Sequence, residues 1–271
     1  MLYTAYFDEA DTHGPTPTII MAGFLGTARQ WELFDRRLRA LQRRDGFTIF
    51  HVAEFKGKSG EFAGWRDSKC AKLVRDLTVL VRDTLTEGLT VHLEHQRYMT
   101  EYRAPPIPKK MTLDSQYGVC FRSCMHQILK ILMTGGKPHR VDVVIERGHR
   151  NAGDTVRIFE DLKLRLKQRR GLDLLGNITI AKKEDRAPLM VADFLASTYS
   201  MMRASQARGE IDYAAVTPDP LKRQAGLTFL ELLPDALRQL KADFEADRQE
   251  TAAVWRARRE AYSAGKEDRT A

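Results

Sequence analysis

The sequence predicts an α/β protein with a mixed β-sheet flanked by helices. Two apolar runs at the start of the chain, residues 2–8 and 18–25, are separated by turn residues and predict an antiparallel hairpin. Further along, strand-like runs alternate with helical patterns, which is typical of parallel strands joined by helices. With 43% hydrophobic residues in a chain of 271, the protein can bury a substantial core.

The first part of the chain continues with helices and short strands. A helix is predicted over residues 28–44 because large apolar residues recur there at helical spacing. Residues 47–52 predict a third strand, which leads into a loop at residues 57–64. A second helix is predicted over residues 67–86, followed by a strand over residues 89–93.

The middle of the chain repeats this alternation after a break. Three prolines exclude regular structure from the basic segment 104–110, which predicts a loop or flap. The elements predicted after it are helices over 113–133 and 154–169, strands over 141–146 and 177–181, and a helix that opens at Pro188.

We expect the chain to consist of two parts. Residues 1–205 form the α/β domain, and residues 206–271 form a helical, charged C-terminal extension in which helical patterning resumes near residues 227–240. The tail beyond residue 242 mixes both signs of charge. This pattern fits a long exposed helix, an arm that binds a partner protein, or a partly disordered segment. The sequence does not indicate an oligomeric state.

The charge balance of the chain is basic. There are 44 lysine and arginine residues against 36 acidic ones, a formal net charge of +8. Such an excess favours a polyanionic partner, such as nucleic acid, DNA or RNA, without proving one. The basic residues cluster at 36–44 and 163–170, although each cluster taken alone is better explained as the solvated face of an amphipathic helix.

Cysteine usage and hydropathy indicate the compartment. The three cysteines are too few and wrongly spaced for a disulfide framework, and no histidine stands at zinc-ligand spacing from them. No apolar run approaches the roughly 18 residues of a membrane span, and the N-terminus lacks a basic region followed by an apolar core. We therefore expect a soluble, cytoplasmic protein with no membrane partner and no recognisable export signal.

Three acidic residues each close or interrupt an apolar element. Asp8 ends the first strand, Glu146 ends the strand at residues 141–146, and Asp193 interrupts the apolar segment 189–196. If the two strands are parallel neighbours, Asp8 and Glu146 end at the same edge of the sheet, where sites form in open α/β folds. Three carboxylates so placed outline a site for Mg²⁺ or Mn²⁺. The structural alternative for each acid is a helix cap or an ion pair with a nearby arginine.

Basic and imidazole groups accompany these acids along the chain. His51 and Lys56 follow the run at residues 47–52 and are candidates for moving a proton or holding a phosphate, although a plain loop hydrogen bond explains His51 equally well. The segment after Glu146 and the segment before the Asp193 helix offer further donors for phosphate. These donors are Arg147, His149, Arg150, Lys182 and Lys183, and His149 is also a candidate proton carrier.

Several short motifs resemble one family. The sequence YFDEAD at residues 6–11 is followed by a Gly-Phe pair at 23–24 and a helix that begins near Trp31. The motif FHVAEFK stands at residues 50–56, and LMVADFLA stands at 189–196. Together these motifs resemble the bacterial and phage domain of unknown function 3800 family, and the resemblance covers roughly residues 2–200.

The resemblance implies a ribonuclease H-like fold and a metal-dependent nuclease with Asp8, Glu146 and Asp193 as its acidic set, acting in phage defence or in a mobile element. The family more commonly has Asp at the end of the strand that here ends in Glu146, so the third ligand is either Glu146 or another residue. Glu9 is either a further metal ligand or a cap of the turn. The rival hypothesis is a non-catalytic ribonuclease H-like module that binds nucleic acid or protein.

Overall fold

The computed structural model describes residues 1–10, 18–104, 113–134, 139–210 and 226–246. The chain divides into two compact units. The larger unit comprises Met1–His95 and Thr112–Glu231, and the smaller comprises Gln96–Met111 and Leu232–Ala271.

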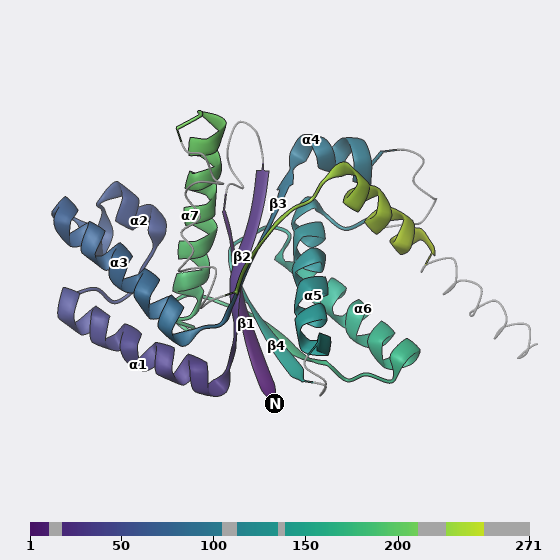
Figure 1. The fold of residues 1–271 in the computed structure, drawn as a ribbon, viewed down its shortest axis with the longest axis horizontal. Coiled ribbons are helices and arrows are strands. Elements are labelled where there is room, and N and C mark those ends of the chain that lie inside the picture. Colours follow the sequence, from purple (N-terminus) through teal and green to yellow (C-terminus); the bar gives the residue numbers. More distant parts are fainter. Residues whose placement is uncertain (11–17, 105–112, 135–138, 211–225, 247–271) are drawn as a thin grey trace, which may run out of the picture. The chain divides into compact units, whose positions relative to one another are not determined.

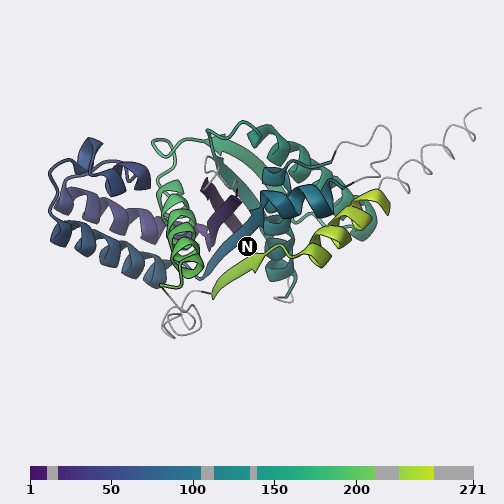
Figure 2. The ribbon, with the colours of Figure 1, turned by 90° about the horizontal axis from the view of Figure 1, so that it is seen from above.

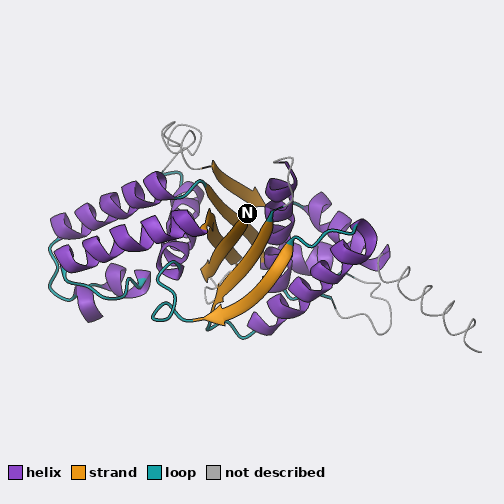
Figure 3. Ribbon diagram, turned by 90° about the horizontal axis from the view of Figure 1, so that it is seen from below, coloured by secondary structure: helices purple, strands orange, loops and turns teal. Residues whose placement is uncertain are grey.

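The larger unit is built on a six-stranded mixed sheet with the order β5-β4-β1-β2-β3-β6 (Figure 1, Figure 3). β1 pairs antiparallel with β2, which pairs antiparallel with β3, whereas β4 lies parallel to β1, and β5 parallel to β4. β6 joins the other edge, parallel to β3. The strands are β1 (Leu2–Ala10), β2 (Thr18–Thr27), β3 (Glu87–Glu94), β4 (Arg140–Glu146), β5 (Leu175–Ala181) and β6 (Gly226–Glu231).

Helices cover both faces of the sheet. α7 (Leu189–Ala207) packs against β1 and β2 on one face, and α5 (Gln116–Thr134) packs against β2 and β3 on the other, with α6 (Ala152–Arg170) beside it (Figure 1, Figure 2). The remaining elements of this unit are α1 (Ala28–Asp45), α2 (Val52–Gly57), η1 (Gly60–Phe62) and α3 (Asp67–Thr84). The predicted α/β class, with a mixed sheet flanked by helices, is confirmed.

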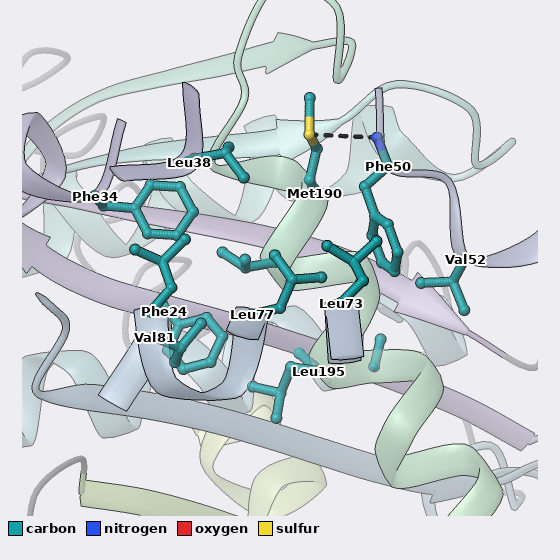
Figure 4. Close-up of a cluster of buried hydrophobic side chains, with 14 of the residues drawn as sticks. Phe24, Phe34, Leu38, Phe50, Val52, Leu73, Leu77, Val81, Met190 and Leu195 are labelled. Carbon is teal, nitrogen blue, oxygen red and sulfur yellow. Dashed lines mark hydrogen bonds between the residues drawn. The ribbon is translucent and has the colours of Figure 1, made fainter. Parts of the chain in front are cut away.

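The main hydrophobic cluster joins α1 and α3 to the α7 side of the sheet (Figure 4). Phe34 of α1 and Leu73 of α3 are fully buried in it, together with Met190 of α7. The backbone N–H of Phe50 donates to Met190 Sδ at 3.4 Å, which ties the segment before α2 to the start of α7. The cluster thus fixes the position of α7 over β1 and β2.

Helix α1 has clear local start and stop signals. The Thr27 side chain accepts a hydrogen bond from Gln30 N, and the Gln30 side chain accepts one from Thr27 N, which is a capping box. Gly46 ends the helix in the left-handed conformation, at φ +73°, that glycine adopts without strain.

Close packing of the two central strands requires glycine at position 23. A Cβ atom there would lie 2.0 Å from the backbone oxygen of Tyr6 and 2.5 Å from Phe7 Cδ1. Gly23 pairs with Phe7 across the β1–β2 ladder. It therefore lets β2 approach β1 directly beside Asp8.

Two predicted elements are wrong. Residues 47–51 are not a strand, and the helix α2 begins at Val52. The apolar residues of this run instead pack into the main cluster, where Phe47 lies against Phe62 and Trp65. Residues 226–231 are not helical but form β6, because their backbone pairs with β3 at the edge of the sheet.

The smaller unit is helical where it is described. It contains most of the short α4 (His95–Arg97), the π-helical turn η2 (Tyr98–Tyr102) and helical residues 234–246. Arg238 forms ion pairs with Glu101 and Asp235. The expected basic loop at 104–110 and the tail proposed to bind a partner protein lie almost entirely outside the described residues. No described helix is long and apolar enough to cross a membrane.

Candidate functional site

The pairing of β1 with β4 brings two of the predicted acids to the same edge of the sheet. Tyr6 lies opposite Val144 and Phe7 opposite Ile145 in the parallel ladder, so Asp8 and Glu146 are the next residues of their strands. Tyr6 packs with Val144 and Leu189 on the face that α7 covers. Side chains alternate along a strand, so Asp8 and Glu146 point to this same face.

Helix α7 supplies the third predicted acid. Asp193 lies in its second turn, between apolar residues that pack into the core, such as Ala192 and Leu195. One of its oxygens, Oδ2, accepts a hydrogen bond of 3.1 Å from the backbone N–H of Val52, the first residue of α2. The carboxylate is thereby held in place by two elements that are far apart in the sequence.

The three acids converge on one atom, the ammonium nitrogen of Lys183. Lys183 Nζ lies 2.6 Å from Glu146 Oε2, 2.9 Å from Asp8 Oδ2 and 3.2 Å from Asp193 Oδ2. The Lys183 side chain is 6% exposed and that of Asp8 is 4% exposed. The predicted acidic set therefore forms a single cluster in which Asp8 is buried and Glu146 and Asp193 are partly buried, and Lys183 lies at its centre.

Burial makes this cluster electrostatically unusual. Burial, and then the nearby Glu146 carboxylate, raise the pKa of Asp8 to about 8, although Lys183 opposes the shift. Burial also raises the pKa of Asp193. For Lys183, burial lowers the pKa, but the three carboxylates together outweigh burial and raise it above its usual value. One ammonium does not neutralise three carboxylates, so the site retains an excess of negative charge when all are ionised.

Glu9 follows Asp8 and so points to the opposite face of the sheet, where α5 packs. Burial, and then the nearby Asp8 carboxylate, raise the pKa of Glu9 to about 8. Its Oε2 is buried and makes no hydrogen bond of good geometry among the described residues. Tyr117 of α5 lies beside it and stacks on the ring of His149, with centroids 4.1 Å apart. His149 Nδ1 also accepts a hydrogen bond from Asn151 N.

The oxygen chemistry of the cluster suits a hard divalent cation, which prefers carboxylate ligands. Asp8 Oδ2 is close enough to Lys183 Nζ for an ion pair, yet the contact is poorly aligned and leaves this buried oxygen without a proper hydrogen bond. Within the described residues, no three His, Cys, Asp or Glu side chains are grouped so as to hold a metal ion as they stand. Asp8, Glu146 and Asp193 are not such a group because the Lys183 ammonium lies between their carboxylates.

The other predicted site residues lie around this cluster or outside it. His51 faces Glu184, the neighbour of Lys183, at 3.9 Å between Nε2 and Oε1. Lys56 donates to Ser197 Oγ at 2.7 Å. The side chains of Arg147, Arg150 and Lys182 are exposed and so accessible to a large ligand.

Sequence reasoning missed two features of the site. The first is the central position of Lys183, because the sequence alone predicts the same role, phosphate donor, for Lys183 and for the exposed Lys182. The second is the backbone N–H of Val52, which no sequence pattern marks as a partner of Asp193. The nearby FHVAEFK motif was a signal that this segment belongs to the site, but it did not identify which atom takes part.

Comparison with known proteins gives little further information. The sequence matches no family model and no curated protein. Among solved structures, it is similar to a chain in the PCNA:RNase HII complex from Archaeoglobus fulgidus, with 14% sequence identity and a TM-score of 0.37. The match covers 81% of this chain and 84% of that one. A TM-score of this size carries no argument about the fold or the activity of this protein.

Proposed function

We propose that this protein is a divalent-metal-dependent nuclease with a ribonuclease H-like fold, related to the domain of unknown function 3800 family. The observation that carries the proposal is the meeting of the Asp8, Glu146 and Asp193 carboxylates within 3.2 Å of one point. These acids come from two parallel strands and a packed helix, so they are held rigidly. A structural ion pair needs one carboxylate, and three around a single ammonium exceed that requirement.

The Asp8, Glu146 and Asp193 carboxylates would hold Mg²⁺ or Mn²⁺, whereas Glu9 points to the opposite face of the sheet and lies outside this ligand set. A cation of this kind lowers the pKa of bound water and stabilises charge on a phosphodiester. The chain's own residues orient the acids through the Val52 N–H, exclude bulk water from the buried Asp8, and offer exposed cations at the rim. Arg147, Arg150 and Lys182 are the candidates for phosphate contacts. Lys56 and His149 are further candidates for holding a phosphate or moving a proton.

The substrate we propose is nucleic acid, either DNA or RNA. The net charge of +8 favours a polyanion, and exposed arginines at the end of β4 directly follow Glu146. The three cysteines are free, which fits action in the reducing cytoplasm.

A panel of single- and double-stranded DNA and RNA tests this function. Wild type should cleave at least one substrate with Mg²⁺ or Mn²⁺ and none with EDTA, and a folded Asp8→Asn variant should be inactive. Asp185→Asn is the matched control, because Asp185 is exposed in the turn before α7. Cleavage that survives both EDTA and Asp8→Asn would exclude this acid cluster as the site.

The Lys183 ion pairs also favour a second candidate, a non-catalytic module that binds nucleic acid. In that case the acids and Lys183 are a purely structural network, and the exposed basic residues bind the phosphate backbone. This alternative predicts salt-sensitive binding, no cleavage of any substrate with either metal, and binding unchanged by Asp8→Asn.

A further inference from the structure

Lys183 lies where the three proposed metal ligands converge. Its Nζ is within 2.6–3.2 Å of one oxygen from each of Asp8, Glu146 and Asp193. Both Lys183 and Asp8 are more than nine-tenths buried. The ammonium therefore occupies the volume that these oxygens enclose, and water has little access to it.

A metal ion that used the same three oxygens would come very close to this ammonium. Mg²⁺ binds oxygen ligands at roughly 2.0–2.1 Å. Two cations that contact the same oxygens at such distances repel each other strongly in a site with little water. The Lys183 side chain and the metal cannot both be bound fully to the three acids.

The chain around Lys183 allows its side chain to move. Lys183 follows the end of β5 and lies in a turn in which Lys182 O accepts hydrogen bonds from Asp185 N and Arg186 N. Lys182 and Glu184, on either side of it, are exposed. A lysine has four flexible carbons, so its ammonium can reach solvent or a bound phosphate without any change in the strands.

We propose that the Lys183 ammonium and a divalent cation are alternative occupants of the space between Asp8, Glu146 and Asp193. Lys183 is thus a positioning residue, which keeps the acids together in the metal-free protein and sets the metal concentration at which they load. This inference rests on the proposed metal-dependent function. It goes beyond that function by naming the group that the metal displaces.

Direct Mn²⁺ binding tests the competition without any substrate. Lys183→Met keeps much of the side-chain volume and removes the charge, so its Kd for Mn²⁺, measured by calorimetry or by electron paramagnetic resonance of free Mn²⁺, should be at least about tenfold lower than that of wild type. The same variant in EDTA should unfold at a lower temperature at pH 8, and Mn²⁺ should raise that temperature more than it does in wild type. An unchanged or weaker Mn²⁺ affinity would overturn the proposal.

Lys183→Arg separates charge from packing. It retains the cation, so its Mn²⁺ affinity should stay within about threefold of wild type, because the competitor is still present. If Lys183→Arg tightened Mn²⁺ binding as much as Lys183→Met, loss of the ammonium charge would not be the cause, and the competition would be refuted.

A measurement on the wild-type protein covers the case in which Lys183→Met does not fold. With ¹⁵N-labelled lysine side chains, the buried Lys183 amine should give a resonance that is absent from Lys183→Arg. Saturating Mg²⁺ should shift this resonance and bring its protons into fast exchange with water. A resonance that is unchanged by saturating Mg²⁺ would contradict displacement.

Failure of this inference is distinguishable from failure of the proposed function. Metal-dependent cleavage together with unaltered Mn²⁺ affinity in Lys183→Met would keep the nuclease and reject the competition. Tighter Mn²⁺ binding by Lys183→Met without cleavage of any substrate would keep the competition and reject the nuclease. Absence of Mn²⁺ binding in both proteins would reject both.

Discussion

Phe7 of β1 lies opposite Ile145 of β4 in a parallel ladder. This one pairing brings the next residues of the two strands, Asp8 and Glu146, to the same edge of the sheet. Asp8 is buried at this edge, and only 3% of the residue is exposed. An ionised carboxylate buried in this position lowers the free energy of unfolding unless a cation binds to it. This effect on stability can be measured.

Asp8→Asn should stabilise the metal-free protein while it removes metal-dependent activity. Burial of an ionised carboxylate is unfavourable, and an amide of the same shape avoids that penalty. In EDTA at pH 8 we expect a gain of about 1 kcal/mol, or roughly 3 °C in Tm for a domain of this size. Thermal unfolding followed by circular dichroism measures the change. A clear loss of stability would show that Asp8 serves mainly as a structural partner of Lys183.

The metal-free protein should also become less stable as pH rises. The pKa values of Asp8 and Glu9 are about 8 in the folded protein, against 3.8 and 4.5 as ordinary values. The folded state therefore keeps protons that the unfolded chain has already lost, so the stabilisation is complete below about pH 4 and is lost as pH rises towards 8.

Urea unfolding in EDTA at several pH values between 5 and 8 measures this slope. The double variant Asp8→Asn, Glu9→Gln should show a flatter dependence over the same range, because neither amide titrates. If the double variant kept the wild-type slope, the dependence would arise from other groups.

The acidic residues of the site were accessible to sequence reasoning because each stands at the end of a periodic pattern. Asp8 and Glu146 follow apolar strands, and Asp193 breaks an apolar helix face. Strand periodicity places the first two at one edge if β1 and β4 are parallel neighbours, and the structure shows that they are.

The remaining features depend on contacts that local patterns do not encode. Lys182 and Lys183 look alike in the sequence, and the way the chain turns after β5 buries one and exposes the other. The run at residues 47–51 has the composition of a strand, but its aromatic rings pack with Phe62 and Trp65 instead of joining the sheet. β6 is a strand because its residues pair with β3, which is far away in the sequence. The local sequence pattern does not contain this pairing and predicts a helix there.

Gly23→Ala should destabilise the fold, whereas Gly153→Ala should not. A methyl group at position 23 would meet the backbone oxygen of Tyr6 at 2.0 Å, and backbone cannot move aside without opening the β1–β2 ladder. We expect a loss of about 1–3 kcal/mol in unfolding free energy. Gly153 lies in α6 with nothing within 4 Å of an added Cβ, so alanine there should be neutral or stabilise by up to about 1 kcal/mol. Equal effects of the two substitutions would refute the packing argument.

Val52→Pro should weaken metal binding with little effect on the fold. The substitution removes the N–H that donates to Asp193 Oδ2, and Val52 is the first residue of α2, where proline is well tolerated. The preceding residue, His51, already has the extended conformation, φ −100° and ψ 119°, that proline requires before it. Loss of such an orienting hydrogen bond typically lowers metal affinity about 10- to 100-fold.

Val52→Ala is the matched control, because it trims the same buried side chain and keeps the N–H. We expect Val52→Ala to lose some stability but to bind Mn²⁺ with nearly wild-type affinity, and Val52→Pro to show the reverse. Calorimetric titration with Mn²⁺ and thermal unfolding in EDTA measure the two properties separately. If both variants bound Mn²⁺ equally well, the hydrogen bond from residue 52 would not be what holds Asp193 in place, and packing of α7 against β1 and β2 would be sufficient to orient it.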